Sequence, residues 1–492
     1  MVGIIDDVSY ILGRAVAAGA SACYEARSLI AAEIVHGKPR RSRYPNARVW
    51  VNRMKSRRFI DLFAGCGGLS LGLSLAGMRG VFSIERDDMA FDTFLTNLVA
   101  GSAPEAHRFE WPDWLERRAW GIDELLDEHK EQLVALRGTV RVLAGGPPCQ
   151  GFSFAGRRVE DDPRNLLFEK YVEVVEAIQP DALILENVPG MRVAHRPSNV
   201  VELPIGRPAR QSFYEKLRAR LQAAGYVVDA DLIDASRFGV PQRRSRLIAI
   251  GVRKDLVELL DDGIGRVFQL LEEARVQQLK DLDLGERVSA EQAISDLTIS
   301  GRQLVQCVDP ESKRGFVEGV RGAATSTYQQ LMRADAMVEP NSMRLAHHRD
   351  DVRDRFARIL AECRRGVRMN DAARRGYGLK KHRIYPMSAS DPAPTITTLP
   401  DDVLHYSEPR ILTVRESARL QSFPDWFRFK GKFTTGGARR TKECPRYTQV
   451  GNAVPPYLAR AIGVAVGTAL DEIELIQRFF GPAPKSASAA AR

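Results

Sequence analysis

Cys149 stands in a loop rich in glycine and proline, Gly145-Gly-Pro-Pro-Cys-Gln-Gly-Phe-Ser, directly after a short apolar run that is typical of a strand. A thiol on such a loop can be activated by neighbouring cationic groups, because the thiolate is the reactive form. The commonest alternative for a free cysteine is a small apolar side chain in the core. The prolines before Cys149 and the glycine after it disfavour that alternative, so the loop predicts a nucleophile.

An acid and two arginines could assist this nucleophile. Glu186 lies near the end of the apolar run Asp181–Asn187, and a carboxyl group at the end of a buried strand suits proton donation to a ring nitrogen. Arg244 and Arg246 alternate with Ser245 at the start of the last apolar run, so both would point to one face of a strand. Such arginines can bind a base carbonyl oxygen and orient an acid, although a single arginine is more often a surface ion-pair residue.

A second candidate site begins at Asp61-Leu-Phe-Ala-Gly-Cys-Gly-Gly-Leu-Ser, which follows an apolar run and opens a helical pattern. Its glycines, Gly65, Gly67 and Gly68, allow a tight turn and a close approach of the backbone to a ligand. The next apolar run ends at Glu85, where an acid can accept hydrogen bonds from ribose hydroxyls. Turn and acid together suit a nucleoside ligand, and the structural alternative is a tight turn beside a solvated glutamate.

Strands and helices must position these motifs. Through the first half of the chain, short apolar runs that are typical of strands alternate with helical patterns. The predicted strands are Arg58–Phe63, Gly80–Glu85, Val140–Gly145, Asp181–Asn187, Tyr226–Ile233 and Arg246–Val252. The predicted helices are Leu69–Leu75, Met89–Leu98, Ile122–Leu136, Asn165–Ile178, Ser212–Ala223 and, near the end, Pro456–Leu470. The alternation predicts a doubly wound α/β fold with a parallel sheet, whose ligands bind beyond the carboxyl ends of the strands.

The rest of the chain divides by composition. Residues 1–56 look like a helical extension with a basic linker, and residues 57–253 carry the alternating pattern. The pattern fades over residues 254–392, which are charged and irregular, and resumes over 393–478. The tail 479–492 is of low complexity and is expected to be disordered.

Composition limits the classes of function. The 492 residues carry a net charge of +10, with arginine and lysine recurring over 353–383 and again over 430–442, which indicates a polyanionic partner or, alternatively, a solvated face. The six cysteines are scattered without partners at metal-ligand spacing, which favours a reducing cytoplasm and no structural metal. We expect no membrane span, because no apolar run reaches the needed length.

At this point the order of the motifs resembles the DNA (cytosine-5)-methyltransferase family. The blocks concerned are Asp61–Gly68, Gly146–Gln150, Glu186-Asn-Val, Gln242–Arg246, Arg415–Pro424 and Gln449-Val-Gly-Asn-Ala-Val-Pro-Pro. The resemblance covers roughly residues 57–253 and 393–470. It implies an S-adenosylmethionine-dependent catalytic domain and places a smaller target-recognition domain at about 254–392.

The resemblance also implies roles for residues. Cys149 would add to carbon 6 of a flipped cytosine, Glu186 would contact N3, and Arg246 would hold the base carbonyl with Arg244 helping to set Glu186 and Cys149. Phe63, the three glycines, Glu85, Pro147 and Asn452 would bind the cofactor, and Ser153, Arg157 and Arg158 would contact DNA phosphates. The family's acid for the adenine amino group has no clear match, and Glu110 and Asp113 are the candidates.

The expected partner is therefore duplex DNA, with a restriction enzyme or another defence component as a possible associate. One alternative is a tRNA cytosine-5 methyltransferase on the same fold, although the long insert favours groove reading in a duplex. The second alternative function is a catalytically silent DNA-binding scaffold, and intact Cys149, Glu186 and Arg246 argue against it.

Overall fold

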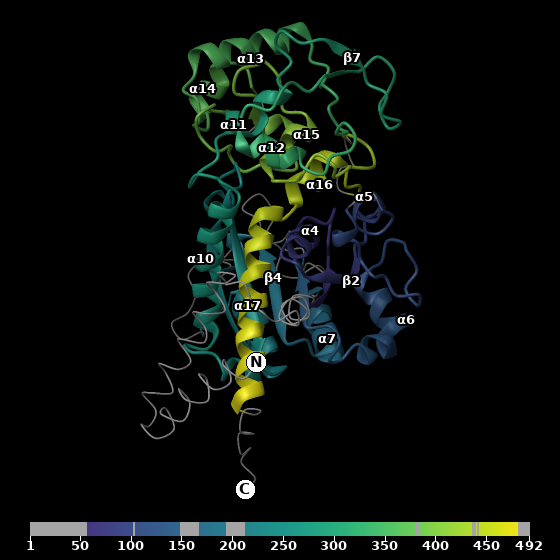
Figure 1. Cartoon of the computed structure of the whole chain (residues 1–492). Coiled ribbons are helices and arrows are strands. Elements are labelled where there is room, and N and C mark those ends of the chain that lie inside the picture. Colours follow the sequence, from purple (N-terminus) through teal and green to yellow (C-terminus); the bar gives the residue numbers. More distant parts are fainter. Residues whose placement is uncertain are drawn as a thin grey trace, which may run out of the picture.

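A six-stranded sheet forms the centre of the computed structural model, which describes residues 57–101, 104–147, 167–192, 212–379, 383–434, 439 and 442–480 (Figure 1). Its order is β2-β1-β3-β4-β6-β5. The strands are β1 Arg58–Leu62, β2 Arg79–Ile84, β3 Val142–Gly145, β4 Ala182–Asn187, β5 Tyr226–Asp234 and β6 Ser245–Arg253. Each lies within one or two residues of its predicted bounds, because each is an apolar run closed by turn residues.

One strand direction differs from the prediction. β6 is antiparallel to both β4 and β5, so the sheet is mixed rather than parallel. Only residues 235–244 join β5 to β6, and they hold just a short 3-10 turn, η4 Ala235–Phe238. A parallel crossover needs a dozen or more residues, so this connection forces a hairpin-like return. The first residues of β6 therefore lie at the edge of the sheet where β4 ends.

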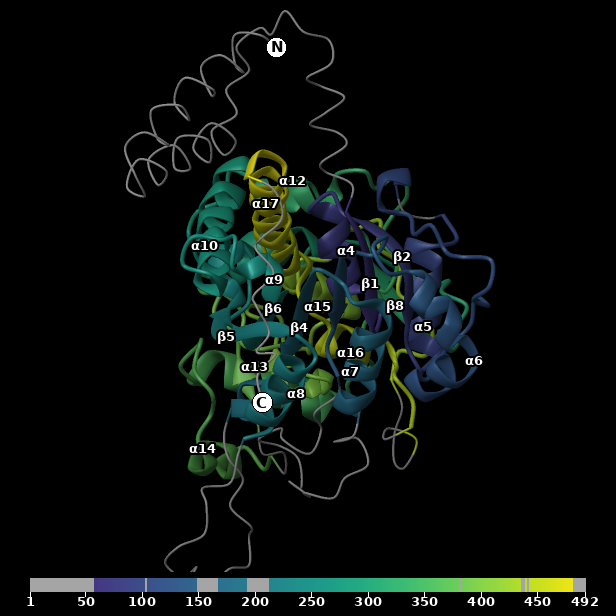
Figure 2. The same cartoon turned by 90° about the horizontal axis from the view of Figure 1, so that it is seen from below.

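Helices cover both faces of the sheet, as a doubly wound fold requires (Figure 2). One face carries α4 Gly68–Leu75, α10 Ile264–Asp281 and α17 Pro456–Phe480, and the other carries α6 Ile122–Ala135, α7 Leu167–Ile178 and α8 Phe213–Ala223. α5 Asp88–Leu98 follows β2, and the single-turn α9 Lys254–Val257 follows β6. The α/β class predicted from the sequence is thus confirmed.

The last helix, α17, is a core element longer than predicted. The stretch Arg446–Phe479 is long and apolar enough to cross a membrane by length and composition alone, which differs from our expectation. However, 78% of its apolar window is buried inside the protein. α17 approaches α4 so closely that a Cβ on Gly72 would lie 2.2 Å from the Cβ of Ala459. Such burial is typical of the core helix of a globular domain.

A second, smaller domain lies over the carboxyl ends of the strands (Figure 1). Its helices are α11 Ala290–Ile294, α12 Thr327–Arg333, α13 Asp350–Glu362, α14 Asp371–Gly376 and α15 Val414–Leu420. α16 Arg446–Asn452 lies between the two domains, since it contacts α15 and its Gln449 bonds to Thr93 and Met89 of α5. The strands of the second domain are β7 Leu304–Gln306, β8 Val317–Gly319, β9 Tyr385–Pro386 and β10 Val403–Leu404, with 3-10 turns at Ser295–Leu297 and Pro400–Asp402. A further 3-10 turn, Glu105–His107, and another at Pro189–Arg192 belong to the catalytic domain.

Contacts of two helices bear on the predicted boundaries at 254 and 393, which stay predictions. α9 and α10 belong to the catalytic domain: the amide of Gln278 on α10 donates to the carbonyls of Phe238 and Tyr457. Conversely α15, which we placed with the returning segment, packs inside the second domain against α11.

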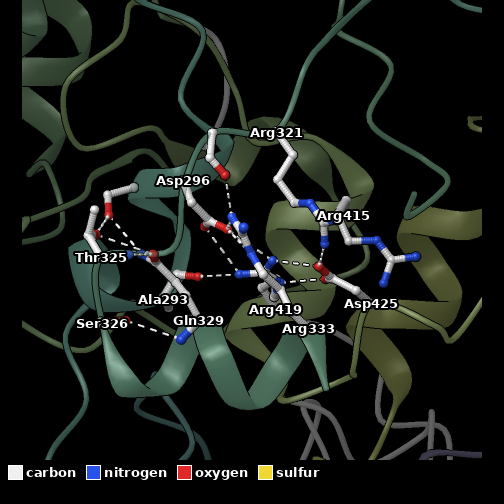
Figure 3. Close-up of polar contacts among 12 residues, drawn as sticks. Ala293, Asp296, Arg321, Thr325, Ser326, Gln329, Arg333, Arg415, Arg419 and Asp425 are labelled. Atoms are coloured by element: carbon white, nitrogen blue, oxygen red, sulfur yellow. Dashed lines mark hydrogen bonds and ion pairs between the residues drawn. The ribbon is translucent and has the colours of Figure 1, made fainter. Parts of the chain in front are cut away.

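Ion pairs in the core of the second domain hold α15 in place. Arg419 is fully buried and reaches Asp425, with 2.6 Å between Nε and Oδ1, and also Asp296, with 3.2 Å between Nη2 and Oδ2 (Figure 3). Arg333 pairs with the same Asp296, and Arg321 with the same Asp425. Buried charges are tolerated only when paired and hydrogen-bonded, and here both carboxylates have two arginines.

We predict that His405, buried in the same domain, makes stability depend on pH. Burial lowers the pKa of its imidazole from 6.5 to about 4, although Glu416 opposes the shift. Its Nδ1 accepts hydrogen bonds from the backbone N–H groups of Ser407 and Glu408, so the fold uses the neutral ring. Between pH 6.5 and 4 the unfolded chain takes up a proton that the folded chain excludes, which removes roughly 3 kcal/mol of stability.

Urea unfolding of the wild type and of His405→Gln across that pH range measures this effect. The wild type should lose stability more steeply than the variant as pH falls, and parallel curves would contradict the prediction.

Candidate active site

An acid and an arginine meet at the carboxyl edge of the sheet. The Oε1 atom of Glu186 near the end of β4 lies 2.7 Å from the Nε atom of Arg246 at the start of β6. Their side chains are 13% and 12% exposed, so the pair is shielded from bulk water but still reachable. The antiparallel direction of β6 makes this contact possible, because a parallel β6 would deliver Arg246 to the opposite edge.

The loop that leads to Cys149 is fixed against this pair. A Cβ on Gly146 would lie 3.2 Å from the carbonyl oxygen and 3.3 Å from the Oε2 atom of Glu186. The side-chain amide of Asn187 donates to the carbonyl of Pro147 at 3.0 Å. The chain therefore leaves β3 directly beside Glu186. Cys149 itself lies outside the described residues, as do the predicted phosphate contacts Ser153, Arg157 and Arg158.

Arg244 makes contacts other than those we expected. It precedes β6, is 1% exposed, and its terminal nitrogens donate to the carbonyls of Ile396 at 3.0 Å and Gly451 at 2.8 Å. Burial lowers the pKa of Arg244 well below its usual value, and the charge of Arg246 adds to that shift while Glu186 opposes it. Its hydrogen bonds go to backbone carbonyls and not directly to Glu186, so a role of Arg244 in setting Glu186 and Cys149 stays a prediction.

The glycine turn after β1 and the acid after β2 are joined. Both carboxylate oxygens of Glu85 accept backbone hydrogen bonds, from the N–H of Gly65 at 3.0 Å and from that of Asp87 at 2.8 Å. Burial raises the pKa of Glu85, while these hydrogen bonds lower it. Phe63 and Gly67 have positive φ values of 62° and 96°, so the backbone reverses sharply into α4.

This turn fits a nucleoside-containing cofactor. A Cβ on Gly65 would meet no atom within 4 Å, so the backbone there faces open space beside Glu85. The carboxylate keeps lone pairs for ribose hydroxyls, since two backbone donors do not saturate it. A Cβ on Gly68 would lie 2.3 Å from the carbonyl oxygen of Val454, which places the exposed Asn452 near the same turn.

Of the two candidates for the adenine contact, Glu110 is excluded by its position. Its carboxylate pairs with Arg58 at 2.6 Å, and its N–H donates to the carbonyl of Gly80. Both partners lie at the amino ends of their strands, opposite the glycine turn. Asp113 is exposed on the segment that returns towards Glu85, where the N–H of Trp120 donates to the Glu85 carbonyl. Asp113 therefore stays a prediction.

Two residues in the recognised motifs have contacts that sequence reasoning did not assign. Asn187 holds Pro147, as described, and Gln242 is fully buried between the carbonyl of Leu420 and the N–H of Ile396. Asn187 ends an apolar run, and a buried amide must find partners, so its position is a usable signal; Gln242 stands in a basic motif that gives no such signal. Within the described ranges, no group of three His, Cys, Asp or Glu residues could hold a metal ion.

Comparisons with known proteins identify the family. The family model for C-5 cytosine-specific DNA methylases matches residues 57–468. The chain is 30% identical over 430 residues to the Type II methyltransferase M.DdeI of Desulfomicrobium norvegicum, covering 85% of this chain and 90% of that protein. It is 31% identical over 415 residues to M.XorII of Xanthomonas oryzae pv. oryzae, covering 84% of each.

The fold recurs in the crystal structure of a prophage-encoded Escherichia coli protein described as a DNA modification methyltransferase. The TM-score is 0.54 at 23% identity, over 84% of this chain and 99% of that one, which supports the fold alone. Together with the family match, the sheet, the paired Glu186 and Arg246 and the glycine turn lead to one assignment. The chain belongs to the C-5 cytosine-specific DNA methylase family and is a DNA (cytosine-5)-methyltransferase.

Proposed function

We propose that the protein transfers a methyl group from S-adenosylmethionine to carbon 5 of cytosine in one duplex DNA sequence, through base flipping and a covalent adduct with Cys149. The observation that carries this proposal is the ion pair between Glu186 and Arg246 beside the Gly146-Pro147 backbone. A proton donor, a carbonyl-binding cation and the base of the nucleophile loop thus meet within one small region.

S-adenosylmethionine, when bound, supplies an electrophilic methyl group on a sulfonium. The glycine turn at Gly65, Gly67 and Gly68 would receive it together with Phe63, Pro147 and Asn452, and Glu85 would accept hydrogen bonds from its ribose. Gly67 adopts a left-handed backbone conformation that other residues rarely take, so this tight turn requires glycine there.

The protein residues then carry the steps on the base. The thiolate of Cys149 adds to carbon 6, and Glu186 donates a proton to N3 so that charge does not build up on the ring. Arg246 hydrogen-bonds the base carbonyl and fixes the ring against Glu186. Carbon 5 becomes enamine-like and takes the methyl group. A base removes the proton from carbon 5, and elimination restores the ring and frees Cys149.

This chemistry needs an unstacked base, because carbon 6 is inaccessible within a duplex, and flipping costs a few kcal/mol. The second domain would read the sequence in the major groove, while Ser153, Arg157 and Arg158 would contact phosphates. Part of the basic stretch 353–383 is already neutralised, since Arg353 pairs with Asp350 and Arg374 with Asp371. Unpaired arginines and lysines would carry most of the phosphate contacts.

A role in a Type II restriction-modification system or another defence system follows from the names of the relatives M.DdeI and M.XorII. Methylation at one short sequence would protect that sequence from a matching endonuclease. The enzyme would act in the cytoplasm, where bacterial DNA is accessible.

The test is methyl transfer from labelled S-adenosylmethionine to unmethylated duplex DNA of mixed sequence, followed by bisulfite sequencing. Total tRNA and a Cys149→Ser variant are run beside it. We expect label in DNA at cytosines of one short motif, and none with the variant. Label in tRNA alone would assign the enzyme to RNA instead. DNA binding without label in either substrate would favour a silent scaffold.

A further inference from the structure

The motif Gln242-Arg-Arg-Ser-Arg246 contains two kinds of arginine. Arg246 faces Glu186 at the site, whereas Arg244 and the neighbouring Gln242 are turned into the protein and are 1% and 0% exposed. A fully buried guanidinium whose bonds go to main-chain carbonyls rather than to a carboxylate is costly to bury. The presence of the Arg244 guanidinium beside the site therefore calls for a reason other than the stability of the fold.

The buried pair connects the start of β6 to two segments of the second domain and to α16, which lies between the domains. Gln242 accepts a hydrogen bond from the N–H of Ile396 at 2.8 Å and donates to the carbonyl of Leu420, the last residue of α15, at 3.2 Å. Arg244 donates to the carbonyls of Ile396 and Gly451, the latter on α16. The backbone beside them is paired as well, since the N–H of Arg243 donates to the carbonyl of Ala393.

The second domain is rigid on its own side of this junction. The side-chain amide of Gln421 donates to the carbonyl of Val450 at 2.8 Å, which joins the end of α15 to α16. Arg419 on α15 is held to Asp296 beside α11 and to Asp425 (Figure 3). Hydrogen bonds and ion pairs therefore connect α11 to α15, α15 to α16, and α16 to Arg244. Arg244 precedes Arg246 by two residues.

We propose that Gln242 and Arg244 are positioning residues that form the joint between the two domains and set the place of Arg246, and through it Glu186, according to the position of the second domain. The proposal rests on the proposed function of Glu186 and Arg246. A displacement of the second domain on bound DNA is passed to Ile396, Leu420 and Gly451 and so to the entry of β6. The contacts of Arg244 to two carbonyls need its planar fork, which a lysine cannot supply.

The first experiment measures single-turnover methyl transfer with enzyme in excess over DNA that carries the target sequence. The rate constant reports how well the site is arranged, and the amplitude reports the fraction of enzyme that is folded and competent. Arg244→Lys should lower the rate constant tenfold or more with an unchanged amplitude. A loss of amplitude at an unchanged rate constant would mean that Arg244 only stabilises the fold, and would overturn the proposal.

A matched control is Arg57→Lys. Arg57 is 5% exposed and pairs with Asp471 and Glu474 on α17, at the amino edge of the sheet. We expect a lower unfolding midpoint and an unchanged single-turnover rate constant for this variant. An equal fall in the rate constants of both lysine variants would show that any buried arginine has this effect, and would contradict a positioning role.

Two further measurements separate Arg244 from Arg246 and from the activity itself. If Arg244 acts through Arg246, the double variant Arg244→Lys/Arg246→Lys should be no slower than Arg246→Lys alone; multiplied losses would overturn the proposal. A crystal structure of Arg244→Lys should show the contact between Arg246 Nε and Glu186 Oε1 opened from 2.7 Å beyond hydrogen-bonding distance. An unchanged contact would refute the proposal that Arg244 positions Arg246. An inactive wild type would instead refute the proposed function.

Discussion

Replacing Glu186 with glutamine is expected to lower the single-turnover rate constant of methyl transfer by about 10²–10⁴-fold, the range that a positioned general acid contributes. Glutamine keeps the shape and can still accept a hydrogen bond from Arg246, but it cannot give a proton to N3. Because the ion pair with Arg246 is lost while the packing is kept, the change falls mainly on the chemical step. DNA binding should change only a few-fold.

Rapid quenching with labelled cofactor measures the rate constant, and fluorescence anisotropy measures DNA binding. Asp181→Asn is the matched control, since Asp181 lies just before the other end of β4 and pairs with Arg141 and Arg253. Its loss should affect stability and leave the rate constant unchanged. A Glu186→Gln enzyme that turns over at the wild-type rate would remove Glu186 from the proposed mechanism.

The sequence predicts where the strands of the sheet lie, but it does not predict the direction of every strand. The strands of the sheet are apolar runs or, in β5, a largely alternating pattern of buried and exposed residues, so local pattern located them. The direction of β6 depends on the connection after β5, which is too short for the crossover that a parallel strand requires. The antiparallel return is also what brings Arg246 to Glu186. The predicted pairing of these two residues is therefore inconsistent with the parallel sheet that we predicted, and their catalytic roles stay predictions.

Contacts distant in sequence explain the remaining differences. Arg244 was given a role from its spacing to Arg246, but its partners lie at Ile396 and Gly451, far along the chain. α10 lies where the alternating pattern of strands and helices fades in the sequence, whereas its buried face, with Leu270 and Leu271, packs in the structure, where α10 contacts α17. Neither partner is visible in a local pattern, because burial of one face depends on what the rest of the chain brings to it.

The largest expected effect on stability is that of Arg419→Met. Arg419 and its partners Asp296 and Asp425 are all buried, and methionine fills a similar volume without a charge. Breaking a buried ion pair by removing one partner typically costs 3–5 kcal/mol, because the remaining charge is left uncompensated. Here each carboxylate keeps a second arginine, Arg333 or Arg321, so we expect about 3 kcal/mol, the lower end of that range.

Urea unfolding followed by tryptophan fluorescence measures this loss, since Trp426 is next to Asp425 in sequence and buried in the second domain. The matched control is Arg220→Met, which removes an exposed pair with Glu169 and should cost less than about 1 kcal/mol. If Arg419→Met costs as little as the control Arg220→Met, the buried cluster contributes little to the stability of the second domain. A loss near 3 kcal/mol would instead show that the polar core holds α15 against α11. Because α15 contacts Gln242 through Leu420, such a variant should also slow methyl transfer at urea concentrations where it is still folded.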